Sequence, residues 1–370
     1  MDVINMSLGS TNGLNNASDG TYRAMAKARE AGVLTVVSAG NEGLNFSPTS
    51  DGDDYYGYLD DGVVGAPGSQ ETAFTVASIE NSTVTMKLAF IGDDSTGVPY
   101  GLQEGPAFED TDYQVVDAGF GGADDFKANV DYSDKVALVQ RGGDLSFVQK
   151  FENAAAHDVA GLIVFNHEAG GEELINMAGT DGVDFPLVFL GHSAGSHLRE
   201  LISKNTTANI RFSSEVGSLD NESALTPSTF TSWGTTPSLD FKPQIAGIGG
   251  NVYSTLNDNT YGTKSGTSMA APNVAGMSAL MLENYSERFG SSVSRTDQLE
   301  LIKTALMNTA QILENDEGLP YAPRQMGAGL AQVDKALATD VFATVDGDAS
   351  VALREVNEAR SFTVTLSNRG

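Results

Sequence analysis

Residues 33–37 read Val-Leu-Thr-Val-Val, and this short, continuous apolar run decides the class of fold that the sequence predicts. Such a run is typical of a strand that is buried on both faces, as the strands of parallel sheets are. Before it, the alanine-rich segment 18–29 favours a helix, and Gly32 stands where a helix stop is expected. The opening segment 3–8 reads as another strand that runs into a turn at Gly9. Strand, helix and strand in this order predict a right-handed crossover and a parallel sheet.

Two polar loops directly follow these predicted strands. Residues 7–9 read Ser-Leu-Gly, and residues 38–43 read Ser-Ala-Gly-Asn-Glu-Gly. Ligands of parallel α/β sheets bind at the carboxyl ends of the strands. The sequence therefore predicts that both loops lie at a functional edge of the sheet.

Between about residues 90 and 217 the sequence changes character. Segments 135–139, 161–166 and 185–190 read as strands, and the apolar residues between Phe147 and Ala155, together with Asp158, follow helical spacing. This pattern predicts a compact module with its own core. The predicted domains are a sheet domain in two parts, 1–89 and 218–340, the inserted module 90–217, and the start of a further β domain at 341–370.

The segment around Ser268 carries the strongest chemical signal. Residues 266–272 read Gly-Thr-Ser-Met-Ala-Ala-Pro and lead into an apolar helix face. Because proline is tolerated in the first turn of a helix, Ser268 is predicted to lie close to a helix N-terminus. Its backbone N–H, with the helix dipole behind it, would there stabilise negative charge on a carbonyl oxygen. Asn41, at the end of a predicted strand, would supply a second donor. An isolated Gly-Thr-Ser is more often a helix cap, so this segment alone is ambiguous.

Three segments resemble motifs of the subtilase family of serine proteases, and they occur in the family's order. Residues 4–9 resemble its substrate-cradling strand, and residues 38–43 resemble its oxyanion-hole motif. Residues 266–276, Gly-Thr-Ser-Met-Ala-Ala-Pro-Asn-Val-Ala-Gly, resemble its nucleophile motif. The resemblance implies an endopeptidase with Ser268 as the nucleophile and Asn41 as the oxyanion donor.

The resemblance also implies a substrate-binding set for protein or peptide substrates. Its members are Ser7, Leu8, Gly9, Ala39, Gly40 and Thr267. The first three would pair with the substrate backbone as an added strand. Ala39 and Gly40, together with Asn41, would wall the primary specificity pocket.

Nearly the whole chain resembles lactocepin-like cell-envelope proteinases. Residues 135–166 are similar to the protease-associated domain that those enzymes carry as an insertion, and the tail from about 341 is similar to the start of their fibronectin-III-like domain. The remaining matches are segments 232–234, 242–243, 251–255 and 324–329. The implied fold is α/β, a subtilisin-like three-layer parallel-sheet domain, here incomplete, with an inserted protease-associated domain of α+β or β type.

Two positions depart from the family's pattern. Residues 247–250 read Gly-Ile-Gly-Gly where the family usually has Ala-Pro-Gly-Gly, which puts the rigidity of this loop in doubt. Asn273 follows the proline behind the nucleophile, where a histidine is common. We expect little consequence from the second departure.

The aspartate and histidine that would activate the nucleophile belong before residue 41 in the family's order, and no matching motif is found there. The four histidines all lie in the predicted insertion, at positions 157, 167, 192 and 197. Because a serine hydroxyl is a poor nucleophile without a base, this chain alone is expected to be inactive. We expect an N-terminally truncated protein, and the alternative is a separate polypeptide that supplies the missing half.

Composition limits the partners. The formal net charge is −28, with 49 acidic and 21 basic residues, which argues against nucleic acid and anionic membrane surfaces as partners. The absence of cysteine excludes disulfides, thiolate zinc sites and cysteine nucleophiles. No segment approaches the roughly 20 apolar residues of a membrane helix.

Weaker sequence signals bear on a possible cofactor, on the cellular location and on an alternative function. The acidic segments 51–54 and 60–61 could hold a structural calcium ion, although their spacing is not that of an EF-hand and favours a solvated turn. The resemblance implies an extracellular or cell-wall location, although no leader precedes Asp2. An intracellular subtilase fits the missing leader but not the insertion or the tail. The rival from another class is a non-catalytic protein that binds peptides without cleaving them.

Overall fold

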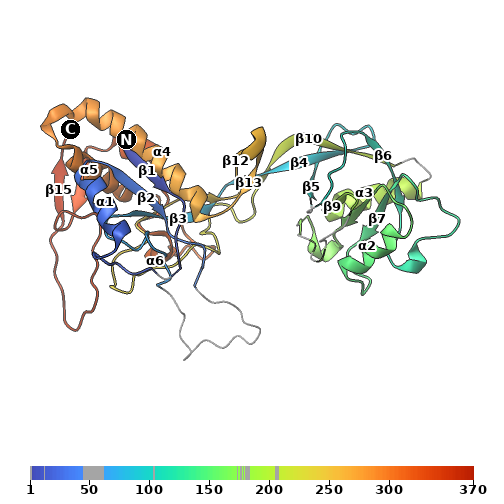
Figure 1. Ribbon diagram of the computed structural model, residues 1–370, viewed down its shortest axis with the longest axis horizontal. Coiled ribbons are helices and arrows are strands. Elements are labelled where there is room, and N and C mark those ends of the chain that lie inside the picture. Colours follow the sequence, from blue (N-terminus) through green and yellow to red (C-terminus); the bar gives the residue numbers. More distant parts are fainter. Residues whose placement is uncertain are drawn as a thin grey trace. The chain divides into compact units, whose positions relative to one another are not determined.

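The computed structural model describes residues 2–11, 13–44, 62–102, 105–172, 174–175, 177, 179, 184–204 and 208–370. The chain forms two compact units, drawn in Figure 1. The first unit comprises residues 1–84 and 220–370, and the second comprises residues 85–219.

A four-stranded parallel sheet is the centre of the first unit. Its strands are ordered β1-β2-β3-β11, with bounds Val3–Met6, Leu34–Ser38, Phe74–Glu80 and Ile245–Gly250. Helix α1 (Gly20–Glu30) connects β1 to β2, and Asp19 caps its start by accepting hydrogen bonds from the amides of Thr21 and Tyr22. The predicted strand, helix and strand and the predicted parallel sheet are therefore confirmed.

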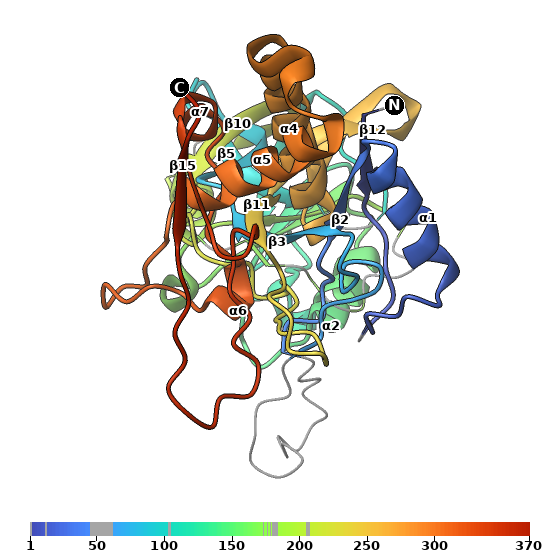
Figure 2. The same cartoon turned by 90° about the vertical axis from the view of Figure 1, so that its left-hand side faces the viewer.

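Helices cover both faces of this sheet, as the end-on view in Figure 2 shows. Adjacent strand residues point to opposite faces, and Val36 and Val37 accordingly belong to different cores. Val36 packs in a core with α4 (Thr267–Phe289) and α5 (Arg295–Asn308). Val37 packs against Met25 of α1. The result is a three-layer α/β unit, in which α6 (Pro323–Met326) and α7 (Val333–Ala338) complete the helices.

Two antiparallel hairpins are attached to this unit. Strands β12 (Val252–Leu256) and β13 (Thr260–Lys264) immediately precede α4. Strands β14 (Val341–Thr344) and β15 (Thr365–Asn368) lie near the end of the chain, and Phe342 is buried against Tyr285 of α4. Residues 341–370 thus belong to the first unit, and their assignment to a fibronectin-III-like domain stays a prediction.

The second unit is a closed β-barrel with strand order β10-β4-β5-β9-β8-β7-β6. Alternate residues of its strand β8 face two cores, one with α2 and one with α3. The bounds are β4 Thr83–Ile91, β5 Val98–Leu102, β6 Asp112–Asp117, β7 Val136–Gln140, β8 Gly161–Phe165, β9 Leu187–Leu190, β10 Asn209–Asp220, α2 Phe147–Ala155 and α3 His192–Ser203. Four short 3₁₀ turns complete the elements, at Ala123–Asp125, Glu168–Gly170, Asn257–Asn259 and Gly290–Ser292.

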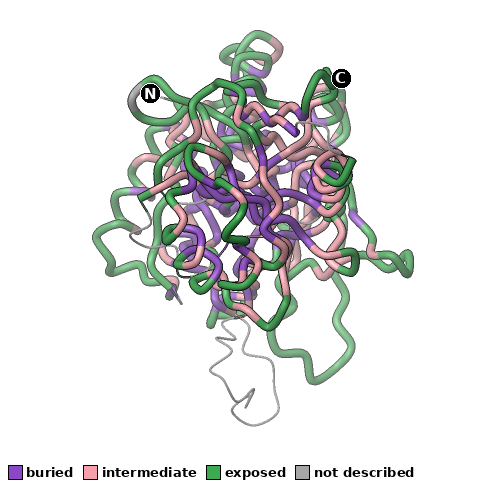
Figure 3. Tube along the Cα trace, turned by 90° about the vertical axis from the view of Figure 1, so that its right-hand side faces the viewer, coloured by how far each residue is buried: buried purple, intermediate pink, exposed green. Residues whose placement is uncertain are grey.

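The elements predicted for this module are present with small shifts. The three predicted strands correspond to β7, β8 and β9, and Figure 3 shows buried residues gathered inside and exposed residues in the loops. Helix α2 ends at Ala155, so Asp158 was wrongly included in the helical pattern; its positive φ of 52° places it in a turn. The identity of this unit as a protease-associated domain stays a prediction. In the described part of the chain, no helix combines the length and the apolar character needed to span a bilayer.

Candidate active site

The start of α4 leaves one backbone donor open at Ser268. The first four amides of a helix have no partner inside the helix. Here the Thr267 amide donates to Oδ1 of Asn41 at 2.9 Å, and the Met269 and Ala270 amides donate to the carbonyl of Gly266 at 2.8 and 3.3 Å. No described residue accepts from the Ser268 amide. The N-terminal partial charge of a 23-residue helix therefore remains available at this position.

Asn41 lies three residues beyond the end of β2, and Thr267 fixes the orientation of its carboxamide. Oδ1 of Asn41 accepts from both the amide and the hydroxyl of Thr267, each at 2.9 Å. A flipped carboxamide would set its NH₂ group against the Thr267 amide, two donors facing each other. Nδ2 is thereby turned away from Thr267, and among the described residues it has no acceptor.

The two open donors converge on one point. A Cβ atom placed on Gly266 would lie 3.6 Å from the Ser268 amide nitrogen and 3.6 Å from Nδ2 of Asn41. Glycine leaves this space empty. The sulfur of Met269 lies at the same distance of 3.6 Å from this position. Two N–H donors this close to one position can together bind an oxygen that carries negative charge.

A cavity of about 210 Å³ opens beside Ser268. It is lined by Leu8, Gly9, Ser10, Ser38, Gly40, Asn41, Glu42, Gly65, Thr267 and Ser268. Two predicted substrate-binding residues are not among them. Ser7 instead donates its hydroxyl to the carbonyl of Ser268 at 2.7 Å. Ala39 is fully buried and holds the loop through its backbone, donating to Val76 and accepting from Gly65.

Glycines of β11 bring the sheet close to the start of α4. The Gly266 amide donates to the carbonyl of Gly249 at 2.8 Å, and a Cβ on Gly249 would lie 2.6 Å from the carbonyl oxygen of Gly266. Gly247 similarly faces the carbonyl of Ala270. Residues 247–250 lie in β11, which pairs with β3 and has a register shift between Ile248 and Gly250. The doubt about the rigidity of this segment stays a prediction.

Four cavity residues were not assigned a role from the sequence: Ser10, Ser38, Glu42 and Gly65. Ser10 and Gly65 are brought together by a bridge in which the Ser10 amide donates to Ala66 at 2.9 Å. This contact spans more than fifty residues, and no local pattern signals it. Glu42 was visible inside the motif 38–43, and its acidic side chain next to Asn41 was an available signal.

All four histidines belong to the second unit, and local contacts account for three of them. His157 bonds the carbonyl of Asn153 and stacks on Phe126. His167 caps a 3₁₀ turn by accepting from the Gly170 amide. His192 contacts the carbonyl of Asn166 and the hydroxyl of Ser196. These partners are typical of structural histidines.

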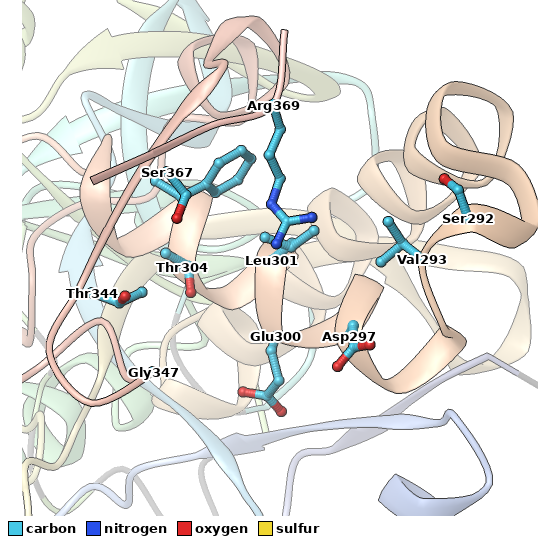
Figure 4. Close-up of a pocket in the computed structure, with 11 residues that line it drawn as sticks. Ser292, Val293, Asp297, Glu300, Leu301, Thr304, Thr344, Gly347, Ser367 and Arg369 are labelled. Carbon is cyan, nitrogen blue, oxygen red and sulfur yellow. The ribbon is translucent and has the colours of Figure 1, made fainter. Parts of the chain in front are cut away.

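A second cavity of the first unit, of about 290 Å³, is drawn in Figure 4 between α5 and the hairpin β14–β15. Its two acidic side chains already have partners. Asp297 accepts from the hydroxyl of Ser294 at 2.7 Å, and Glu300 pairs with Arg29 at 2.8 Å and Lys303 at 3.0 Å. Both acidic side chains of this cavity are therefore engaged by neighbouring groups.

The calcium prediction falls on segments 51–54 and 60–61, which lie outside the described residues. Within the parts of the chain that are described, no group of three acidic or histidine side chains is arranged to hold a metal ion.

Comparison with known proteins gives a family match and several relatives. The model of the subtilase family matches residues 1–329. The PII-type proteinase of Lactococcus lactis subsp. cremoris is 33% identical over 400 residues, covering 100% of this chain and 21% of that protein. The C5a peptidase of Streptococcus pyogenes serotype M6 is 33% identical over 382 residues, covering 99% of this chain and 30% of that protein. The chain thus spans between a fifth and a third of the length of these relatives.

Among solved structures, the subtilisin-like protease Apa1 of Pseudoalteromonas sp. AS-11 is similar with a TM-score of 0.42 at 17% identity, covering 91% of this chain and 70% of that one.

Proposed function

The chain belongs to the subtilase family of serine peptidases, and from this premise we propose that it cleaves polypeptides through an acyl-enzyme on Ser268. The observation that carries the proposal is the point lying 3.6 Å from both the Ser268 amide and Nδ2 of Asn41. In acyl transfer, negative charge develops on the substrate carbonyl oxygen when the serine hydroxyl attacks. Two donors already aimed at that oxygen stabilise the transition state without reorganisation.

The substrate chain would bind along the segment that follows β1. Leu8 and Gly9 line the cavity beside Ser268, and Leu8 is 57% exposed. A peptide lying next to this segment could exchange backbone hydrogen bonds with it as an added strand. Its side chain before the scissile bond would then enter the cavity, where Gly40 leaves room and Glu42 is the one charged lining residue.

The base that activates Ser268 would come from a further segment of polypeptide. Strand β1 is at the edge of the sheet, with β2 as its one paired neighbour among the described strands. Along α4, Pro272, Gly276 and Leu280 are exposed, and Leu280 is a large apolar residue with 56% of its surface exposed. We propose that a segment carrying the family's aspartate and histidine adds to this edge, either as an earlier part of the same polypeptide or as a separate chain. The chain of residues 1–370 by itself would then be inactive.

Labelling with a fluorophosphonate tests this proposal. The chain alone should label no faster than its Ser268→Ala variant, because no base takes the hydroxyl proton. A completed enzyme, meaning the chain combined with a segment that carries the aspartate and histidine motifs, should label at Ser268. Rapid labelling of the chain alone would show that a base is already present and would contradict the missing-base part of the proposal.

The second candidate function is peptide binding without cleavage, and it is favoured by the lack of a described base near Ser268. The two functions predict different results for the completed enzyme. A protease labels at Ser268 and hydrolyses casein, whereas a binding protein retains a fluorescent peptide and does neither. The reading frame immediately upstream of Met1 provides an independent check, since an in-frame aspartate and His-Gly-Thr motif would favour the protease.

We further propose an extracellular or cell-wall location, which rests on the resemblance of the whole chain to cell-envelope proteinases. A structural calcium ion at segments 51–54 and 60–61 stays a proposal of the same kind. Differential scanning fluorimetry with calcium and with a chelator would test it. A melting temperature that calcium does not raise would count against the ion.

A further inference from the structure

Ser232 holds the loop that carries Asn41, although it neither lines the cavity nor belongs to a predicted site. Its side chain is fully buried. Its hydroxyl donates to Oε2 of Glu42 at 2.6 Å and accepts from the Glu42 amide at 3.1 Å. Its own amide donates to the carbonyl of Gly40 at 3.1 Å. One residue therefore binds the positions on both sides of Asn41.

Neighbouring backbone hydrogen bonds also connect these two segments. The Gly43 amide donates to Phe230 at 2.8 Å, and the Trp233 amide donates to Gly43 at 3.0 Å. Segment 230–233 thus runs along segment 40–43 and hydrogen-bonds it at several points. The fit is tight, because a Cβ on Gly40 would lie 2.7 Å from the hydroxyl of Ser232 and 2.4 Å from Oε2 of Glu42. Gly40 also has a φ of +113°, which glycine adopts readily.

Asn41 is consequently held from two directions. Thr267 fixes the carboxamide itself through Oδ1, from the side of α4. Ser232 fixes the flanking backbone at Gly40 and Glu42, from the opposite segment. Neither contact alone determines where Nδ2 points, since a carboxamide is positioned by its backbone as well as by the donors that bind its oxygen. A misplacement of about 1 Å in such a donor costs on the order of a hundredfold in rate.

We propose that Ser232 is a positioning residue for the oxyanion donor Asn41, acting through its hydrogen bonds to Gly40 and Glu42. This role rests on the proposed function, because it matters for catalysis only if Asn41 serves the reaction. The geometric part of the proposal is independent of catalysis. Removing the Ser232 hydroxyl should loosen residues 40–43 and leave the start of α4 in place.

Ser228→Ala is a matched control for Ser232→Ala. Ser228 is also fully buried and lies on the same segment, but its hydroxyl bonds that of Ser78 in β3 at 2.9 Å and its amide donates to the carbonyl of Ser78. Both substitutions remove one buried hydroxyl; Ser232→Ala removes two hydrogen bonds to Glu42, and Ser228→Ala removes one to Ser78. They differ in whether the bond reaches the Asn41 loop.

The first experiment uses the chain itself and measures amide hydrogen exchange together with the carboxamide NMR signals of Asn41. We expect Ser232→Ala to speed exchange at Glu42 and Gly43 at least tenfold and to shift or broaden the Asn41 carboxamide signals. Ser228→Ala should leave both within twofold of the unmodified chain. Equal effects of the two variants, or no effect of Ser232→Ala on residues 40–43, would overturn the proposal.

Glu42→Ala provides a second route if Ser232→Ala does not fold. Glu42 is partly exposed, so its truncation removes the bond from the Ser232 hydroxyl to Oε2 without emptying a buried site, while the bond from the Glu42 amide to that hydroxyl is kept. We expect amide exchange at residues 40–43 to increase several-fold. In the double variant, exchange should be no faster than in Ser232→Ala alone, because the two substitutions remove the same hydrogen bond. Unchanged exchange in Glu42→Ala would also overturn the proposal.

The second experiment uses the completed enzyme and separates kcat from KM. A positioning role predicts that Ser232→Ala lowers kcat ten- to a hundredfold while KM changes less than threefold. A purely structural role predicts a lower yield of folded enzyme with unchanged kcat per active site. If no variant labels at Ser268, the proposed function has failed, and the exchange experiment still decides whether Ser232 holds the loop.

Discussion

Each compact unit of this chain holds a buried lysine whose ammonium group has three acceptors, Lys242 in the first and Lys150 in the second, but open donors beside a cavity are found, among the described residues, at Ser268 and Asn41 of the first unit. In the first unit, the Ser268 amide and Nδ2 of Asn41 face a shared space without a described acceptor. In the second unit, the fully buried Lys150 donates to three backbone carbonyls, those of Phe120, Gln140 and Gly142. Satisfied donors stabilise a loop, whereas open donors at a helix start are poised to bind something that arrives. The difference indicates that reaction chemistry belongs to the first unit.

Gly266→Ala should have the largest effect on the open donors, because its methyl group would occupy the space between them and because Gly266 has a φ of +158°, which residues with a side chain rarely adopt. We expect the kcat of the completed enzyme to fall on the order of a thousandfold or more, as when oxyanion stabilisation is lost. Gly276→Ala is the control, since it lies on the same helix with nothing within 4 Å of the added Cβ. Comparable loss in both variants would mean that the space beside Gly266 has no special role.

Asn41→Leu removes one of the two donors, so its effect on kcat should be smaller than that of Gly266→Ala. The expected loss in kcat is about a hundred- to a thousandfold with KM nearly unchanged, because the hydrogen bond forms in the transition state. Thr267→Val keeps Asn41 but deletes one of the two bonds to its Oδ1, so its loss should be smaller. A Thr267→Val enzyme that is more impaired than Asn41→Leu would contradict this order.

The buried Lys150 predicts a pH dependence of stability for the second unit. Burial lowers the pKa of Lys150 from 10.5 to about 8, with Asp125 partly opposing the shift. The folded state therefore binds fewer protons than the unfolded state between about pH 8 and 10.5, so this residue makes the protein more stable as the pH rises through that window. We expect about 1–2 kcal/mol from this single group. Urea unfolding followed by circular dichroism at pH 7.5 and pH 10 measures it.

Lys150→Met should remove this part of the pH dependence and leave the active site untouched. Other lysines and tyrosines also titrate in the alkaline range, so the informative quantity is the difference between the variant and the unmodified chain. An identical pH slope in the two proteins would show that Lys150 does not carry the effect.

The smallest expected effect comes from the histidines of the second unit. Substituting His157, His167, His192 and His197 one at a time by glutamine should change fluorophosphonate labelling of the completed enzyme less than twofold. The contacts of His157, His167 and His192 with neighbouring residues predict losses of stability rather than of rate. If substitution of one histidine abolished labelling, that residue of the second unit would take part in the reaction. This result would contradict the assignment of the reaction to the first unit.

Local sequence patterns predicted much of the fold. The apolar run before Ser38 and the alanine-rich segment before Gly32 correspond to β2 and α1 with shifts of one or two residues. Strand and helix signals of this kind depend on neighbouring residues, and so they can be read from the sequence. Closure of the second unit into a barrel depends on pairing between distant strands such as β6 and β10, and no local pattern encoded it.

The candidate site was predicted in part for the same reason. Ser268 and Asn41 lie in recognisable motifs, and the structure brings them together through the bond from Thr267 to Asn41, across 226 positions of sequence. The contact of Ser232 with Glu42 spans 190 positions, and it was missed because a buried serine in a polar segment has no distinguishing pattern. Long-range hydrogen bonds of this type become visible once the backbone is placed.

A high-resolution crystal structure of the chain tests the convergence of the two donors most directly. The expected result is an ordered water or anion within about 3.2 Å of both the Ser268 amide nitrogen and Nδ2 of Asn41, with Oδ1 of Asn41 bound to Thr267. A carboxamide turned so that Oδ1 faces the cavity, or an Asn41 side chain on a different side of α4 from Ser268, would contradict the proposed oxyanion site.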